Sequence, residues 1–144
     1  MPSDRPAIVV PDQPTDADRA ALLAALIAFN TDASGLPGPQ PLAVLIQDPI
    51  TGKPVGGLWG RTSYDWLFVE LFVVPEPFRG QGLGADILQR AEDIARSRGC
   101  TGVWPDTYSF QAPDFYAKQG YELFGTIDDH PRGKQRFFYK KRLI

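Results

Sequence analysis

Cysteine and histidine are almost missing from this sequence, which has one of each among its 144 residues. The single cysteine, Cys100, cannot form an internal disulfide and has no pattern of metal ligands around it. We therefore expect a small buried side chain in a protein of the reducing cytoplasm. The single histidine, His130, lies in a turn with Pro131 and Gly133. Because histidines in polar turns are usually solvated, His130 is only a secondary candidate for a loop that contacts an acceptor substrate.

Long hydrophobic runs and an excess of charge of either sign are also lacking. No apolar run approaches the ~20 residues that a membrane-spanning helix requires, and the N-terminal residues do not have the basic and apolar regions of a secretory signal. Fifteen basic against 17 acidic side chains give a net charge of −2, which provides no field to attract nucleic acid or anionic lipid. We expect neither partner, and we leave a homodimer open.

The remaining composition is that of a packed globular protein. Apolar residues make up 43% of the chain and charged residues 22%, whereas a disordered chain has fewer apolar residues and more net charge. A length of 144 residues falls in the commonest range for one domain and permits a core of its own. We therefore predict a single domain over residues 1–144.

Hydrophobic periodicity and turn residues divide the chain into strands and helices. The pattern predicts strands at residues 7–10, 42–47, 55–62, 66–74, 103–108, 121–127 and 136–141, and helices that begin at residues 15, 82 and 113 and end before Gly35, Gly99 and Gly120. The strand at 66–74 has Glu70 as its one polar residue, which favours a central strand covered on both faces. This order of elements predicts an α/β or α+β fold with a mixed sheet and helices packed on its faces.

A glycine-rich segment, Arg79-Gly-Gln-Gly-Leu-Gly84, connects the strand at 66–74 to the helix that begins at residue 82. The free backbone N–H groups of a helix N-terminus bind anions, and glycines allow a pyrophosphate to approach the backbone closely. The guanidinium of Arg79 adds a bidentate donor. The segment therefore predicts a site for a phosphate-bearing ligand.

Two other nucleotide-binding motifs fit this segment less well. A P-loop requires Lys followed by Ser or Thr after the last glycine, where this chain has Ala85 and Asp86. A dinucleotide fingerprint is satisfied by Gly80, Gly82 and Ala85, but residues 75–79 separate it from its strand. The chain that follows also lacks the second half of such a fold, so dinucleotide binding is a distant alternative.

The same segment matches the (Arg/Gln)-x-x-Gly-x-(Gly/Ala) motif of the GNAT superfamily of acetyl-CoA-dependent N-acyltransferases. A second segment, Phe115-Tyr-Ala-Lys-Gln-Gly-Tyr121, is similar to that family's FYxKxGF signature, and the predicted order of elements resembles the family's. The sequence departs from the family at Ser109, where many members have asparagine. The resemblance covers about residues 42–143 and implies a mixed, mostly antiparallel sheet of six to seven strands with helices on both faces.

The resemblance also implies where acetyl-CoA binds. The pantetheine arm would hydrogen-bond the backbone of the strand at 66–74, beside Phe72, Val73 and Val74. A backbone N–H of this strand would polarise the thioester carbonyl. The pyrophosphate would contact the loop, which consists of Arg79, Gly80, Gln81, Gly82, Leu83 and Gly84. Ser109 would lie beside the same ligand, with contacts that differ from those of asparagine, and no metal is implied.

Two residues are candidates for acid–base catalysis. Tyr116 has the position of the family's usual general acid, which protonates the departing thiolate, and its alternative role is ordinary aromatic packing. Glu70 is the candidate base, directly or through water, because burying a carboxylate in an apolar strand is costly unless it is paired or useful. A structural salt bridge is the alternative for Glu70. Asp106 either attracts a cationic amine or hydrogen-bonds the following loop.

The sequence thus predicts an N-acetyltransferase in which a primary amine, of an acceptor expected to be a small molecule, attacks acetyl-CoA directly. Three aromatic residues, Trp59, Tyr64 and Trp66, are candidates for the acceptor pocket, although aromatic residues at strand spacing more often belong to the core. The alternative function is a regulatory module that binds acyl-CoA without turnover, because a ligand-binding loop demonstrates binding more readily than catalysis.

Overall fold

The computed structural model describes residues 4–144. The chain divides into two compact units, one that ends at Gly38 and one from Pro39 to Ile144, and each is described by itself. The single domain expected over the whole chain stays a prediction. Among residues 4–144, no helix is both long and apolar enough to cross a membrane.

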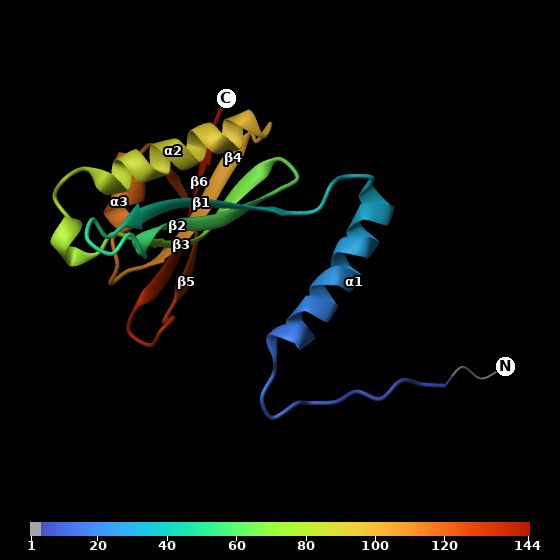
Figure 1. Cartoon of the computed structure of the whole chain (residues 1–144). Helices are drawn as coiled ribbons and strands as arrows, with labels where there is room; N and C mark the ends of the chain where they lie inside the picture. The colour runs from blue at the N-terminus through green and yellow to red at the C-terminus, as the bar shows by residue number, and fades with distance from the viewer. Residues whose placement is uncertain (1–3) are drawn as a thin grey trace. The chain divides into compact units, whose positions relative to one another are not determined.

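The first unit is built around helix α1 (Asp16–Ser34), as the sequence predicts (Figure 1). Thr15 caps this helix reciprocally: its hydroxyl oxygen accepts the N–H of Asp18 at 3.1 Å, and the Asp18 carboxylate accepts the N–H of Thr15 at 2.9 Å. Gly35, in the left-handed conformation, ends the helix. The strand predicted at residues 7–10 is wrong, because these residues have no regular structure. Four apolar residues form a strand only when another strand pairs with them.

The second unit contains a six-stranded sheet with the strand order β1-β2-β3-β4-β6-β5 (Figure 1). β3 and β4 are parallel, and every other neighbouring pair is antiparallel. The strands are β1 (Gln40–Gln47), β2 (Pro54–Ser63), β3 (Trp66–Val73), β4 (Gly102–Tyr108), β5 (Glu122–Asp128) and β6 (Gln135–Arg142). The structure therefore confirms the predicted α/β class with a mixed, mostly antiparallel sheet.

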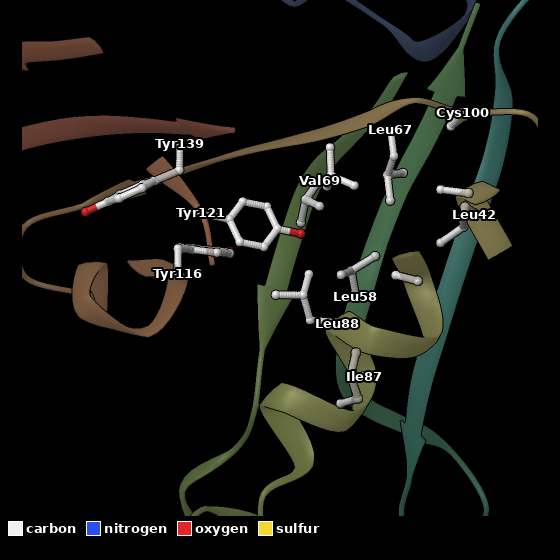
Figure 2. Close-up of a cluster of buried hydrophobic side chains, with 13 residues drawn as sticks. Leu42, Leu58, Leu67, Val69, Ile87, Leu88, Cys100, Tyr116, Tyr121 and Tyr139 are labelled. Carbon is white, nitrogen blue, oxygen red and sulfur yellow. The ribbon is translucent and has the colours of Figure 1, made fainter. Parts of the chain in front are cut away.

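Two helices of the second unit position the candidate site. α2 (Leu83–Ser97) packs on β1, β2 and β3, and α3 (Pro113–Lys118) lies beside β5. The inner face of α2 buries Ile87, Leu88 and Ala91 at helical spacing. These side chains join a cluster of buried residues that Figure 2 shows, with aliphatic side chains such as Leu58 and Leu67 at one end and tyrosine rings at the other. Both helices begin and end within two residues of the predicted positions.

Candidate active site

The sheet opens between its two parallel strands. β3 pairs with β4 from Trp66 opposite Gly102 to Val69 opposite Pro105. Beyond that point, in the part of the chain that the structure describes, β3 pairs only with β2 on its other side, and β4 continues alongside β6. The β4-facing edge of β3 from Glu70 onward therefore has peptide groups that no strand of this unit bonds, and an extended ligand arm can bond them instead.

Glu70 occupies a β-bulge in β3. Trp59 of β2 lies opposite Leu71, and the next residue of β2, Gly60, lies opposite Val69, so Glu70 is the extra residue. A bulge changes the direction in which the following side chains point. The sequence pattern contains apolar residues on both sides of Glu70 and did not predict this irregularity.

The bulge corrects the prediction that β3 is covered on both faces along its whole length. Val69 is buried, but Leu71 and Val73 are 62% and 52% exposed. Phe72 turns instead toward the side that Val69 faces, where its ring lies 6.4 Å from that of Tyr116. The extra residue therefore places the Phe72 side chain at the opening in the sheet and leaves the Leu71 and Val73 side chains exposed.

The glycine-rich segment leads from a short 3₁₀ helix, η1 (Glu76–Phe78), into α2. Gly80 and Gly82 have φ angles of +81° and +74°, and a Cβ atom at either residue would point into open space. Gly82 is the N-cap of α2 and has no side chain to bond the first amides of the helix. Arg79 donates from Nε to the carbonyl oxygen of Val74 at 2.8 Å, which ties its guanidinium to the end of β3. The first N–H groups of α2 are therefore available to an anion.

A cavity of about 970 Å³ joins this loop to the opening in the sheet. Its walls come from β3, the loop before α2, the end of β4 and the start of α3. The predicted site residues that line it are Glu70, Phe72, Val73, Val74, Arg79, Gly80, Gly82, Leu83, Gly84 and Tyr116. Gln81 and Ser109, which were also predicted, do not line it. The fold therefore brings together residues from three separate parts of the chain.

Three residues of the wall, Thr107, Phe110 and Gln111, were not predicted from the sequence. Gln111 closes the loop after β4, because its Oε1 accepts the N–H of Tyr108 at 2.8 Å and the hydroxyl of Thr107 at 3.0 Å. Phe110 stacks on Tyr108 with ring centroids 5.4 Å apart. No motif or periodicity marks these positions, because only the path of the loop places them on the wall.

Tyr116 combines packing with access to the cavity. The residue is only 6% exposed, yet it lines the cavity wall. Its ring neighbours are Phe115 at 5.3 Å, Tyr121 at 5.7 Å, Tyr139 at 5.8 Å and Phe72 at 6.4 Å. Burial, and to a lesser extent the negative charge of Asp106, raise the pKa of Tyr116 above the ordinary value of about 10. The phenol therefore stays protonated at neutral pH and is available as a hydrogen-bond donor.

The surroundings of Glu70 differ from the buried environment that the apolar strand suggested. The Glu70 side chain is 46% exposed, and its closest cation is the Arg61 guanidinium at 3.9 Å. An exposed pair at this distance contributes little to stability, typically about 0–1 kcal/mol. Glu70 is therefore accessible to a ligand in the cavity, and the salt bridge with Arg61 is long.

Asp106 also lines the cavity, from the neighbouring strand β4. Its carboxylate accepts a hydrogen bond from Arg136 on β6 at 2.7 Å, instead of bonding the following loop. This hydrogen bond raises the pKa of the Arg136 guanidinium. Asp106 is therefore already paired, and its availability to a cationic amine is reduced.

The remaining candidates lie away from the cavity wall. The Ser109 hydroxyl accepts the N–H of Gln135 at 3.0 Å and thereby fastens the loop after β4 to β6. His130 packs edge-on against the Tyr108 ring at 5.4 Å. Cys100 is buried, as expected. The aromatic residues Trp59, Tyr64 and Trp66 are not part of the cavity lining.

The sheet opens beside a glycine loop at a helix N-terminus, and this arrangement suits an extended ligand that bears phosphate groups. Comparisons with known proteins identify the family. The model of the acetyltransferase (GNAT) family matches residues 12–121. A blasticidin-S acetyltransferase from Streptomyces morookaense is 45% identical over 83 residues, which are 57% of this chain and 61% of that protein. An acetyltransferase from Agrobacterium fabrum is 34% identical over 117 residues, which are 81% of this chain and 85% of that protein.

A solved structure agrees with these relatives. The crystal structure of a protein described as an acetyltransferase, from Agrobacterium tumefaciens, superposes on this chain with a TM-score of 0.85 at 32% identity. The superposition covers 94% of this chain and 98% of that chain. This chain belongs to the GNAT family of acetyltransferases. The family predicted from the two sequence motifs is therefore confirmed.

Proposed function

We propose that this protein is an N-acetyltransferase that transfers an acetyl group from acetyl-CoA to a primary amine of a small-molecule acceptor. The observation that carries the proposal is the continuous cavity of about 970 Å³, which runs from the glycine loop along the free edge of β3 to Tyr116. Acetyl-CoA combines a diphosphate, a long arm with amide groups and a thioester. The cavity offers an anion site, a free strand edge and a hydrogen-bond donor for these parts.

The acetyl donor fits the residues that form the loop and the strand. The open space beside Gly80 and Gly82 allows a diphosphate to reach the first amides of α2, and Arg79 adds positive charge. The free edge of β3 at Phe72 and Val73, together with Val74 directly after the strand, can hydrogen-bond the amides of the pantetheine arm as a further strand would. We keep Gln81, Leu83, Gly84 and Ser109 as proposed contacts of the same substrate.

The proposed reaction is a direct attack of the amine on the thioester. The amine nitrogen forms a bond to the carbonyl carbon, the carbon–sulfur bond breaks, and a backbone N–H on the free edge of β3 stabilises the oxyanion between these events. The nitrogen loses one proton and the sulfur gains one. Tyr116 donates its hydroxyl proton to the departing sulfur and is reprotonated from solvent, and its raised pKa keeps the phenol protonated at neutral pH before the reaction.

Glu70 is the proposed base, and its replacement gives the first prediction. Most amines arrive as ammonium ions with a pKa near 10, so removing the carboxylate should slow the reaction at neutral pH. We expect Glu70→Gln to lower kcat/KM about 10-fold at pH 7. The deficit should shrink as the pH approaches the pKa of the amine, because a free amine needs no base. Initial rates between pH 7 and 10 measure both effects.

The matched control for Glu70→Gln is Arg61→Gln, which breaks the same 3.9 Å ion pair from the other side. Arg61→Gln should keep kcat/KM within a factor of about two, because the pair is half exposed and weak. Equal losses in the two variants, with the same pH dependence, would assign Glu70 to a structural salt bridge and remove it from the mechanism.

A small-molecule acceptor is supported by a relative. The protein from Streptomyces morookaense that is 45% identical over 83 residues is named for the acetylation of blasticidin S. Asp106 and Phe110 also line the cavity of this chain, and we propose that the acceptor binds beside them. A homodimer and one domain over residues 1–144 are also kept as predictions.

A direct test measures CoA binding by calorimetry and CoA release with a panel of primary amines. Binding of acetyl-CoA together with amine-dependent release of CoA supports the proposed function. Binding without turnover of any amine in the panel would point to the regulatory acyl-CoA-binding module. A thermal shift with NAD but none with CoA would overturn both and favour a dinucleotide site.

A further inference from the structure

A charged network that is not part of the cavity lining lies next to Tyr116, because the ring of its member Tyr121 is 5.7 Å from that of Tyr116. Its centre is Glu92 of α2, which is 2% exposed. The Glu92 carboxylate accepts the Tyr121 hydroxyl at 2.7 Å. It also accepts the Lys141 ammonium, at 3.1 Å to one oxygen and 3.2 Å to the other. Neither Glu92 nor Lys141 belongs to the cavity lining, and the reaction proposed above does not use them.

Lys141 extends the network to the end of α3. Its third hydrogen bond goes to the carbonyl oxygen of Gln119 at 3.0 Å, and Gln119 is the C-cap residue of α3. Gln119 and Tyr121 in turn both donate their backbone N–H groups to the carbonyl oxygen of Tyr116, each at 3.0 Å. Glu92 is thereby connected through two routes to the backbone of Tyr116, which lines the cavity.

α3 depends on such an anchor. The helix has only six residues, and no side chain caps its N-terminus. A helix this short is marginal without tertiary contacts, so the place of its C-terminal end is set by what holds Gln119 and Tyr121. Figure 2 shows the rings of Tyr116, Tyr121 and Tyr139 gathered at this end of the buried cluster.

The composition of the network favours a role in placement over a role in stability. A buried ion pair seldom stabilises a protein more than apolar side chains of the same volume would, because both charges lose their hydration. Its hydrogen bonds are directional, however, and fix the geometry of the groups that they join. The three bonds of the Lys141 ammonium define one position for the end of α3.

We propose that Glu92 is a positioning residue that holds the Tyr116 hydroxyl at the thioester, acting through Lys141, Tyr121 and the C-terminal end of α3. The proposal rests on the proposed function, in which Tyr116 donates to the departing sulfur. It adds that α2 has two tasks: its N-terminus forms the anion site, and Glu92 fixes the donor. One helix thereby sets the distance between the anion site and the Tyr116 donor.

The test is a double-mutant cycle between Glu92→Gln and Tyr116→Phe. Because small displacements of a catalytic group lower its rate contribution strongly, we expect Glu92→Gln to lower kcat about 5-fold. The dissociation constant of acetyl-CoA should change less than about 2-fold. In the Tyr116→Phe background the same substitution should have almost no effect on kcat, because the hydroxyl that it displaces is absent. An equal loss of kcat in both backgrounds would overturn the proposal.

Asp93→Asn is the matched control. Asp93 is the next residue of α2, and its exposed carboxylate pairs with Arg96 instead of the network. This variant should retain the full kcat. If Glu92→Gln does not fold, Tyr121→Phe takes its place in the double-mutant cycle with Tyr116→Phe, because it removes the hydroxyl that donates to Glu92. We expect its kcat to fall about 3-fold, again only when Tyr116 is present.

A second measurement separates this proposal from the proposed function. Hydrogen exchange of the Gln119 and Tyr121 amides, which bond the Tyr116 carbonyl, requires no substrate. It should accelerate in Glu92→Gln and not in Asp93→Asn. Unchanged exchange would show that Glu92 does not anchor α3, whatever the activity. If exchange is faster in Glu92→Gln but Tyr116→Phe keeps full turnover, the proposed role of Tyr116 as the donor is contradicted, whereas the role of Glu92 in anchoring α3 is supported.

Discussion

Replacing Tyr116 by phenylalanine is expected to lower kcat about 100-fold, because general acids typically contribute two to four orders of magnitude to such reactions. The ring would still fill its place among Phe72, Phe115 and Tyr139, so folding should be retained. The dissociation constant of acetyl-CoA should change little. Steady-state kinetics with a responsive amine, together with calorimetry of CoA binding, measure the two quantities separately.

The control is Tyr139→Phe. Tyr139 is buried in the same aromatic cluster, with its ring 5.8 Å from that of Tyr116, but it is not part of the cavity lining. This variant should keep kcat within a factor of about two. Similar losses in both variants would mean that the cluster, and not the Tyr116 hydroxyl, supports turnover.

The pH dependence gives the same assignment an independent check. Burial and the charge of Asp106 raise the pKa of Tyr116, which favours the protonated phenol. Deprotonation, which would remove the donor, therefore occurs above the ordinary tyrosine value of about 10. The rate should not fall between pH 8 and 10 through loss of this proton. A fall with an apparent pKa near 10 that disappears in Tyr116→Phe would contradict the raised pKa.

Gly82→Ala is expected to weaken CoA binding about 30-fold. Gly82 has a φ of +74°, where an alanine is strained by about 1–2 kcal/mol, so the loop should relax and turn its amides away from the diphosphate. Each hydrogen bond to a charged group contributes about 1.5–3 kcal/mol, and losing one of them accounts for a change of this size. Calorimetric titration with CoA measures the effect.

Gly99→Ala is the matched control for this loss. Gly99 follows the other end of α2, has a φ of +81°, and also has open space where a Cβ atom would lie. Both substitutions should lower the melting temperature by similar amounts, since the backbone strain is the same in kind. Only Gly82→Ala should change CoA affinity. If both variants bind CoA as the parent protein does, the glycine loop is not the diphosphate site.

Local patterns allowed most of the fold to be predicted. The helices α1, α2 and α3 and the six strands follow from apolar spacing, from capping residues such as Thr15 and from stop residues such as Gly99. The strand expected at residues 7–10 failed because pairing is a tertiary property and an isolated apolar run does not provide it. The loop from Arg79 to Gly84 and the position of Tyr116 were found because they lie in motifs with fixed spacing.

The bulge in β3 lay beyond this local reasoning, although one signal was present. Gly60 stands opposite the irregularity, and a Cβ atom there would collide with the carbonyl oxygen of Phe68. A glycine inside a strand often marks a bulge or a close approach of backbones. The signal does not say which residue of the neighbouring strand is extra, because that depends on how the two strands are aligned.

The sequence by itself determined the family, the order of the elements and the residues of the glycine loop, since these depend on side-chain type and spacing along the chain. Only the tertiary structure decided that β3 and β4 part after Val69, that Glu70 is half exposed, and that Glu92 bonds both Lys141 and Tyr121. The reason is physical: a cavity and a buried charge network are made by segments far apart in the chain, and their geometry is fixed only when those segments pack together.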